Sequence, residues 1–327
     1  MVERSAFVTG GTGFLGRDLL EQLTARGWQI TALHRSTSDP GTLRQLAVRP
    51  AEGDLLDAAS LRRALPAGVD AVFHLAADTS MWSRHAARQT ANNVEGTRNV
   101  VAASRAAGAG RLVHVSSWSV YGLEQGAIGE ELAQQGGRSR VNYDRSKFQA
   151  EEAVRAGVAH GLDAVIVNPA HILGRYDRHG WARLIVAAHK RWLPGVPPGA
   201  GTFCHAPAVA QALIAAAEHG RSGENYLLSG ADASFVEVFR VINQVSGSRV
   251  PLRPLPAWLL RWPARASGAL AALTGREPDI TPQGVAMVLA RARVTSRKAE
   301  HELGYRPAKL ETMVEDSYRW LKGEGLI

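Results

Sequence analysis

The glycine-rich segment Val8–Gly16, VTGGTGFLG, is the feature that most restricts how this chain can fold. It contains the spacing Gly11-x-Gly13-x-x-Gly16, follows the β-rich run Ser5–Thr9, and opens an apolar pattern of helical period. Backbone without Cβ atoms lets peptide N–H groups and the positive end of a helix approach a phosphate. A glycine loop between a first strand and a first helix therefore predicts dinucleotide binding on a parallel βαβ unit.

Strand and helix patterns alternate through the first half of the chain. We expect strands at Ser5–Thr9, Trp28–His34, a run ending near Gly53–Asp54, Ala71–Leu75, Arg111–Ser116 and Ala164–Val167. We expect helices at 57–65, 92–108 and 143–160. This order predicts the α/β class with a Rossmann-type, doubly wound parallel sheet.

The second half of the chain is less regular and predicts a smaller, mostly helical C-terminal substrate lobe. Asn225–Ser229 has the composition of a last strand returning to the sheet. We therefore assign residues 1–167 to an NADP-binding Rossmann domain, to which 202–229 returns. Residues 168–201 and 230–327 form the substrate lobe.

Composition narrows the classes of partner. The 327 residues are 45% hydrophobic and 21% charged, as in ordinary globular proteins, and Cys204 has no second cysteine to pair with. The net charge of +8 is spread without a run of five like charges, which favours scattered surface arginines over a nucleic-acid partner. With no leader pattern and no integral membrane segment apparent, we expect a cytoplasmic protein.

The tip of the second expected strand indicates which dinucleotide binds. It reads ITALHRS, ending at His34-Arg35-Ser36, and the first acidic residue downstream is Asp39. An acid at this tip accepts a hydrogen bond from a ribose 2′-hydroxyl, whereas an arginine suits a 2′-phosphate. Arg35 therefore predicts NADP(H) in preference to NAD(H).

Three side chains have the chemistry of an acid–base site. Tyr143 and Lys147 are four residues apart and share one face of a helix. A phenol has a pKa of about 10, and a neighbouring ammonium favours the phenolate. Ser117 follows the fifth strand, where parallel sheets place ligands, and its hydroxyl can hold a carbonyl beside the phenol.

Taken together, these motifs resemble the extended short-chain dehydrogenase/reductase family. The resemblance is carried, in order, by TGGTGFLG, HLAA, NVEGT, SSWSVYG, YDRSK and KAEHELGYRP, and covers nearly the whole chain. The stretches ALHR, ADTSMW and ENYLLSGADASFVEVF resemble the dihydroflavonol-4-reductase and 3β-hydroxysteroid dehydrogenase-like branch.

The resemblance implies a role for each matching position. Tyr143 would be the general acid/base, Lys147 would bind the nicotinamide ribose and lower the tyrosine pKa, and Ser117 would orient the carbonyl. Asn93 would support the active site, and a homodimer is the family's usual state. Arg35 is a cofactor contact predicted from the strand tip alone. The resemblance implies further cofactor contacts at Thr9, Gly10, Gly11, Gly13, Phe14, Leu15, Gly16, Asp54, Leu55, Ala76, Ala77, Tyr143, Lys147, Asn168, Pro169 and Ala170.

The sequence also departs from the family pattern. Ser-Trp-Ser at 117–119 lacks the Asp-Glu pair of the dehydratases, so we expect no dehydration. The stretch 203–208 lacks an Asp that often caps the next helix. His74 lies in an apolar strand, and we interpret it as a hydrogen-bonded core histidine. We expect no metal site, since no ligand spacing such as H-E-x-x-H occurs.

The substrate region is less defined. The candidates for an aromatic, apolar pocket are Trp82, His85, His171, Tyr176 and Trp181. The stretch Pro256–Leu273 could cover a hydrophobic substrate or touch a membrane surface, but we favour ordinary packing within the second lobe.

These observations predict an NADP-dependent oxidoreductase that interconverts a ketone or aldehyde and an alcohol on a small to medium apolar substrate. A nucleotide-sugar epimerase with tightly held NAD is one alternative, although it needs an acid at the second strand tip. A non-catalytic NADP sensor is another, although the intact Tyr–Lys pair opposes it.

Overall fold

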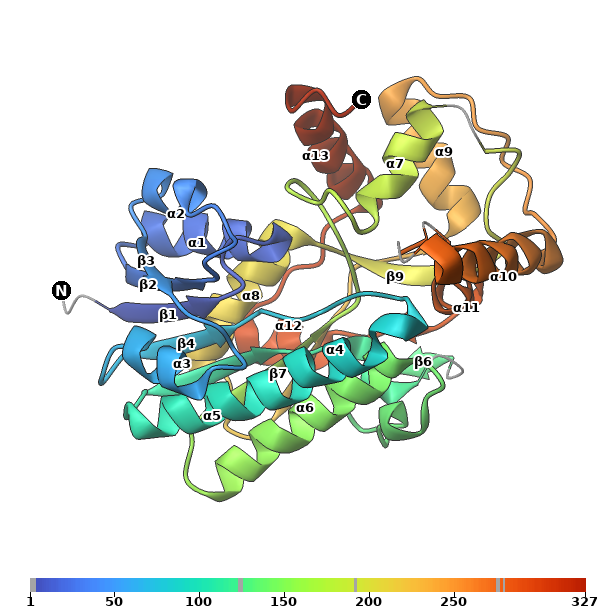
Figure 1. The fold of residues 1–327 in the computed structure, drawn as a ribbon. Coiled ribbons are helices and arrows are strands. Elements are labelled where there is room, and N and C mark those ends of the chain that lie inside the picture. The colour runs from blue at the N-terminus through green and yellow to red at the C-terminus, as the bar shows by residue number, and fades with distance from the viewer. Residues whose placement is uncertain (1–3, 123–125, 191–192, 275–276, 279) are drawn as a thin grey trace.

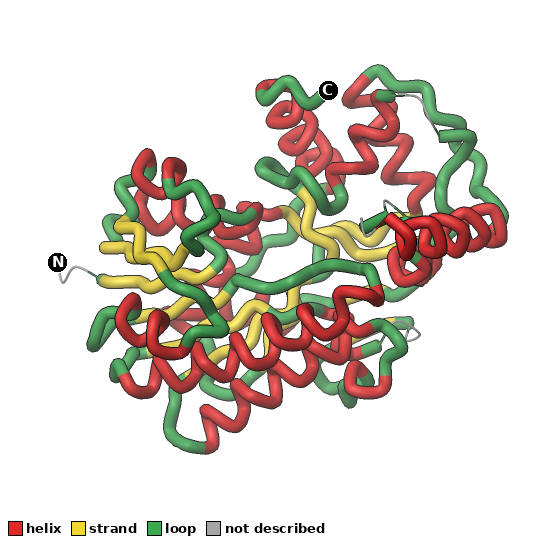
Figure 2. The backbone as a smooth tube through the Cα atoms, viewed as in Figure 1, coloured by secondary structure: helices red, strands yellow, loops and turns green. Residues whose placement is uncertain are grey.

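A parallel sheet of seven strands forms the centre of the molecule (Figures 1 and 2). The computed structural model describes residues 4–122, 126–190, 193–274, 277–278 and 280–327. The strand order is β10-β7-β5-β4-β1-β2-β3. The strands are β1 (Ser5–Thr9), β2 (Gln29–His34), β3 (Arg49–Glu52), β4 (Ala71–His74), β5 (Arg111–Val115), β7 (Ala164–Pro169) and β10 (Asn225–Leu228). The doubly wound parallel sheet predicted from the sequence is confirmed.

Helices cover both faces of this sheet. One layer contains α1 (Phe14–Ala25) and α8 (Ala206–His219), which pack together. The opposite layer contains α3 (Ala58–Ala64), α5 (Gly96–Ala106) and α6 (Asn142–Ala159) (Figure 1). Because both faces are covered, neighbouring strand residues such as Phe7 and Val8 are both fully buried. Phe7 belongs to the hydrophobic cluster that includes residues of α3, α5 and α6, and Val8 to the one that includes residues of α1 and α8. α8 begins without a side-chain cap, as the missing Asp implied.

Several elements differ from the expected boundaries. The helix expected at 92–108 is the end of a longer helical run, in which α4 (Ala86–Thr90) passes through a π-helical turn (Ala91–Glu95) into α5. A short helix, α2 (Gly41–Gln45), and the paired strands β6 (Ala127–Ile128) and β12 (Arg293–Val294) carry little periodic signal. β10 pairs with β7, so the expected last strand does return to the sheet.

A second sheet, of three strands, lies outside the central one. β8 (His171–Leu173), β9 (Ala200–His205) and β11 (Ala231–Ser234) form three strands that the sequence did not predict. Their pairing joins segments about thirty residues apart, such as His171 with Phe203, so no local pattern indicates it. The helices are α7 (Ala182–His189), α9 (Phe235–Ser246), α10 (Ala257–Thr274), α11 (Pro282–Leu289), α12 (Arg297–Leu303) and α13 (Leu310–Gly323). α12 packs on α8 and β10, whereas α13 packs on α9.

Among the residues that the structure describes, no helix combines the length and the apolar character needed to cross a bilayer. The division into a cofactor domain and a substrate lobe stays a prediction.

Candidate active site

The glycine loop lies between β1 and α1, where the strand order reverses between β1 and β4. Gly10 has φ +76°, and a Cβ on it would lie 2.7 Å from the backbone nitrogen of Ala76. A Cβ on Gly16 would overlap the carbonyl oxygen of Gly10. The N-terminus of α1 has no side-chain cap and no acidic residue in its first turn. This cradle fits a phosphate group of a dinucleotide.

Below the loop, His74 is part of a buried hydrogen-bonded chain. The Thr97 hydroxyl donates to the carbonyl of Asn93 (2.6 Å), so Nε2 of His74 must be the donor to Thr97 (2.9 Å). Nδ1 therefore accepts from the Thr9 hydroxyl (2.7 Å), which also accepts from the N–H of Ala76 (3.3 Å). Burial lowers the pKa of His74 to about 3. The prediction of a hydrogen-bonded core histidine is confirmed.

At the tip of β2, Arg35 is exposed. Asp39, the next acid in the sequence, accepts a hydrogen bond from the N–H of Gly41 (2.8 Å) and so closes its own turn. At the end of β3, Asp54 likewise accepts from the N–H of Leu56 (2.8 Å). Arg35 is therefore the charged side chain that this tip presents.

The structure brings Ser117, Tyr143 and Lys147 together. Tyr143 and Lys147 lie on α6, and Ser117 lies two residues beyond the end of β5. The Tyr143 phenol lies near enough to the side chain of Ser117 for that side chain to lower its pKa. The Lys147 ammonium is buried and donates to the carbonyl oxygen of Val115 (2.7 Å), which fixes it two residues before Ser117.

Burial controls the protonation of this group. It raises the pKa of Tyr143 to about 12, an effect opposed by the side chain of Ser117 and increased by the charge of Asp144. It lowers the pKa of Lys147 to about 8, against the opposing influence of Glu151. The phenol is therefore protonated at neutral pH, and its activation by Lys147 stays a prediction.

The backbone of Ser117 is held by a buried polar network that the sequence did not reveal. The Asn168 amide donates to the Ser117 carbonyl (3.1 Å) and to Oε1 of Glu151 (2.6 Å). Oε2 of Glu151 accepts from Gln134 (2.7 Å), Arg155 (2.9 Å) and Asn225 (2.9 Å). Asn168 and Glu151 are fully buried, so the side chain of Asn168 supports Ser117 from below. One signal was present, because Glu151 lies one helical turn beyond Lys147.

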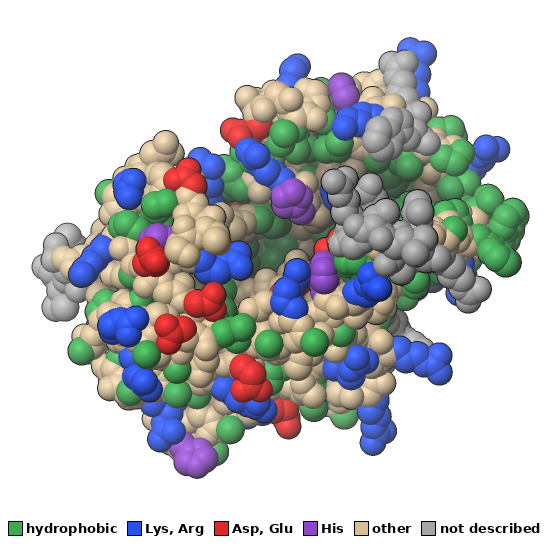
Figure 3. Space-filling model, in the orientation of Figure 1, with side chains coloured by type: hydrophobic (Ala, Val, Ile, Leu, Met, Phe, Trp, Pro, Cys, Tyr) green, Lys and Arg blue, Asp and Glu red, His purple; other side chains and the backbone are tan. Residues whose placement is uncertain are grey.

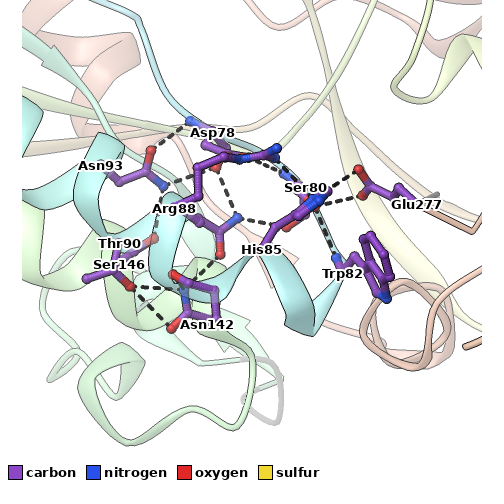
Figure 4. Close-up of polar contacts among 12 residues, drawn as sticks. Asp78, Ser80, Trp82, His85, Arg88, Thr90, Asn93, Asn142, Ser146 and Glu277 are labelled. Carbon is purple, nitrogen blue, oxygen red and sulfur yellow. Dashed lines mark hydrogen bonds and ion pairs between the residues drawn. The ribbon is translucent and has the colours of Figure 1, made fainter. Parts of the chain in front are cut away.

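The loop after β4 is tied to α6 through Asn93 (Figure 4). Oδ1 of Asn93 accepts from the N–H of Asp78 (2.7 Å), and Nδ2 donates to the hydroxyl of Ser146 (2.9 Å). Gln89 donates to the carbonyls of Asp78 (3.0 Å) and Ser80 (2.7 Å). These bonds fix the segment that continues from Ala76 along the cleft.

The five pocket candidates fall into three groups. Trp82 is buried with its ring edge-on to His85 (centroids 4.7 Å apart), and Ser80 and His85 contact Glu277 of the second lobe (2.7 and 3.4 Å) (Figure 4).

The second group contains His171 and Trp181, whose ring centroids are 4.4 Å apart. His171 also contacts Trp118 and Phe203, each at 5.4 Å. Because Trp118 follows Ser117 directly, this aromatic cluster borders the candidate catalytic group.

Tyr176 lies apart from both groups. Its hydroxyl donates to Glu21 of α1 (2.6 Å), and the Arg17 guanidinium lies 4.1 Å from its ring centroid. Its φ of +71° is unusual for a residue with a side chain. Tyr176 therefore packs on α1 through Glu21 and Arg17.

Residues 6–229 match the model of the NAD dependent epimerase/dehydratase family, about two thirds of the chain. The chain belongs to this family. The resemblance to the extended short-chain dehydrogenase/reductases is thereby confirmed. Several relatives of this chain are named reductases or dehydrogenases.

Three relatives of known name align with nearly the whole chain. It is 31% identical to "Sterol demethylase protein B" of Methylococcus capsulatus, over 99% of this chain and 100% of that protein. It is 29% identical to a "Putative dihydroflavonol 4-reductase" of Synechocystis sp., over 98% and 95%. It is 33% identical to a "4-hydroxy-2-methyl-3-oxo-4-farnesyl-3,4-dihydroquinoline-1-oxide ketoreductase" of Stigmatella aurantiaca, over 91% of each.

Solved structures share the fold across the whole chain. The crystal structure of gox2253 matches with a TM-score of 0.84 and 32% identity, covering 99% of both chains. PA4631, "a nucleoside-diphosphate-sugar epimerase from Pseudomonas aeruginosa", matches with a TM-score of 0.77 and 25% identity, covering 98% of both.

Proposed function

We propose that this chain is an NADP-dependent oxidoreductase that interconverts a ketone or aldehyde and an alcohol on a small to medium apolar substrate. The observation that supports it most is the placement of the Tyr143 phenol near the Ser117 side chain, with the buried Lys147 ammonium held at the end of the strand that leads to Ser117. Two adjacent hydroxyl groups can bind one substrate oxygen. In the reductive direction Tyr143, protonated at neutral pH, gives its proton to that oxygen while Ser117 holds it.

A bound nicotinamide cofactor supplies or accepts the hydride. The glycine cradle at Gly10 and Gly16 would hold its pyrophosphate, and Lys147 would bind the adjoining ribose. Arg35 would pair with a 2′-phosphate by a charge-assisted hydrogen bond. The exposed Arg35 and the engaged carboxylate of Asp39 favour NADP(H).

The proposal of an apolar substrate has two supports. The ring of Trp118, directly after Ser117, lies against His171 in a buried aromatic cluster. The names of two relatives refer to a sterol and to a farnesylated quinoline. Both observations favour a hydrophobic ketone or alcohol over a nucleotide sugar.

A nucleotide-sugar epimerase is the second candidate, because PA4631 is named as one. A panel of ketones, aldehydes and nucleotide sugars with NADPH and NADH separates the two, when loss of reduced-nicotinamide absorbance measures reduction and chromatography of the products detects epimerised sugars. We expect turnover of an apolar ketone with NADPH. Epimerisation of a nucleotide sugar without net cofactor consumption would overturn the proposal.

A further inference from the structure

Large hydrophobic side chains are exposed along the first half of α10. Trp258, Leu259 and Trp262 are 59%, 40% and 66% exposed. Ile280, whose carbonyl accepts a hydrogen bond from Ser267 of α10, is 47% exposed. Of the large hydrophobic side chains exposed to this degree in the described part of the chain, only Leu56 lies elsewhere. Figure 3 shows hydrophobic atoms gathered at the right edge of the molecule, over α10.

The exposed side chains lie on one side of the helix. At about 100° per residue, Trp258 and Trp262 lie within about 40° of each other, with Leu259 next to them. Ala264 and Ala271, which are buried, lie on roughly the opposite side. α10 thus packs on the protein through small residues and presents its indole rings to solvent. This differs from the ordinary packing that we favoured from the sequence.

The charged residues in and before this helix are of one sign. Between Glu237 and Glu277 the sequence contains six arginines, no lysine and no acidic residue. Arg261 is exposed, and it lies about 60° around the helix from Trp258. We name the exposed side chains of Trp258, Leu259, Arg261 and Trp262 the α10 face.

We propose that the α10 face docks onto the surface of an anionic phospholipid bilayer. Tryptophan favours the membrane interface because its ring is apolar and its N–H is polar. Arginine beside it adds attraction to anionic headgroups. A second copy of the chain fits less well, because a two-fold contact through this face would bring the Arg261 side chains of the two copies towards each other.

Docking would place a bilayer along the second lobe. The same helix leads to Glu277, which contacts Ser80 and His85 beside the cleft. The docking proposal goes beyond the proposed function, because vesicle binding needs neither cofactor nor substrate. A failure of either one therefore leaves the other testable.

The test is co-sedimentation of the purified full chain with vesicles of phosphatidylcholine, alone or mixed with phosphatidylglycerol. We expect stronger binding to the anionic vesicles, decreasing with salt. Trp258→Ser combined with Trp262→Ser should weaken binding to both by about tenfold or more, since two rings leave the interface. Arg261→Gln should weaken binding to the anionic vesicles alone, by about fivefold.

Leu56→Ser and Arg44→Gln are the matched controls, since both side chains are exposed. Arg44 lies in α2 and Leu56 just before α3, and Figure 1 shows both helices at the opposite end of the molecule from α10. They should bind like the parent. All variants should keep the parent's thermal midpoint, because the substituted side chains are exposed. If the double variant does not fold, Arg261→Gln and quenching of the parent's tryptophan fluorescence by brominated lipid decide the question.

Three outcomes would overturn the proposal. The parent could fail to bind anionic vesicles, or the α10-face variants could bind as well as the controls. The parent could also be a dimer that the double variant dissociates, with no binding to lipid. Light scattering after size exclusion detects that last case.

Discussion

The side-chain amide of Asn168 lies 3.1 Å from the carbonyl oxygen of Ser117 and 2.6 Å from the carboxylate of Glu151. A buried residue of α6, one turn beyond Lys147, is thereby connected to the backbone of the candidate catalytic serine. The Glu151 carboxylate accepts four hydrogen bonds, and all four donors are side chains. It therefore forms the centre of the polar network below the site.

Glu151→Gln should weaken both stability and the site. It replaces one accepting oxygen with an N–H₂ group that faces donors, which costs about 2–4 kcal/mol in the free energy of unfolding. Because the charge of Glu151 supports protonated Lys147, the pKa of Lys147 should fall further. Urea denaturation and the pH profile of kcat measure the two effects.

Glu152→Gln is the matched control. The Glu152 side chain is 58% exposed and lies 3.9 Å from Arg155. We expect a change within about 0.5 kcal/mol in unfolding free energy and no shift of the pH profile. Equal effects of the two substitutions would show that the buried network has no special role.

Tyr143→Phe should reduce kcat by about a hundredfold or more, because it removes the proton donor but leaves the ring in place. Cofactor affinity, measured by fluorescence titration, should stay within a few-fold of the parent. Tyr318→Phe, on α13, is the control and should retain full activity. Normal turnover by the Tyr143 variant would exclude the proposed acid–base role.

Arg35→Asp should reverse the cofactor preference. We expect the parent to bind NADPH about tenfold or more tightly than NADH, through the charge-assisted bond to the 2′-phosphate. The new carboxylate repels that phosphate and can accept from a ribose hydroxyl. Dissociation constants of both cofactors measure this, with Arg44→Asp on α2 as the control. Equal affinities in the parent contradict the assignment.

Two buried histidines should make stability fall in acid. The rings of His74 and His114 are 5.2 Å apart, and burial lowers the pKa of His74 to about 3 and that of His114 well below its usual value. Below pH 6.5 the unfolded chain therefore binds more protons than the folded chain. Stability is full above pH 6.5 and is lost as pH falls, by up to about 1.4 kcal/mol per pH unit for each histidine.

His114→Leu tests this directly. Neither ring nitrogen of His114 has a hydrogen-bonding partner among the described residues, so the substitution removes an unsatisfied polar group. We expect about 1 kcal/mol greater stability at neutral pH and a shallower decline between pH 6 and 4. His219→Leu, at an exposed site, should change neither. Denaturant midpoints across this pH range give the result, and an unaltered slope in the His114 variant speaks against the assignment.

The sequence by itself determined the central sheet and named the residues of the candidate site. The glycine spacing at Gly10–Gly16, the alternation of strands and helices, and the four-residue spacing of Tyr143 and Lys147 are local properties of the chain. Local backbone geometry turns such spacings directly into a turn, a helix face or a strand. For this reason β1 was predicted to the residue, and α6 to within one residue at either end.

Only the tertiary structure decided what surrounds each side chain. Three separate segments bring Glu151, Gln134 and Asn225 together below Ser117. The side chain of Tyr176 contacts α1, and Trp258 and Trp262 of α10 face solvent. The strands β8, β9 and β11 pair only once distant segments are together. Burial and partnership depend on contacts across the whole chain, and no residue pattern within one segment contains them.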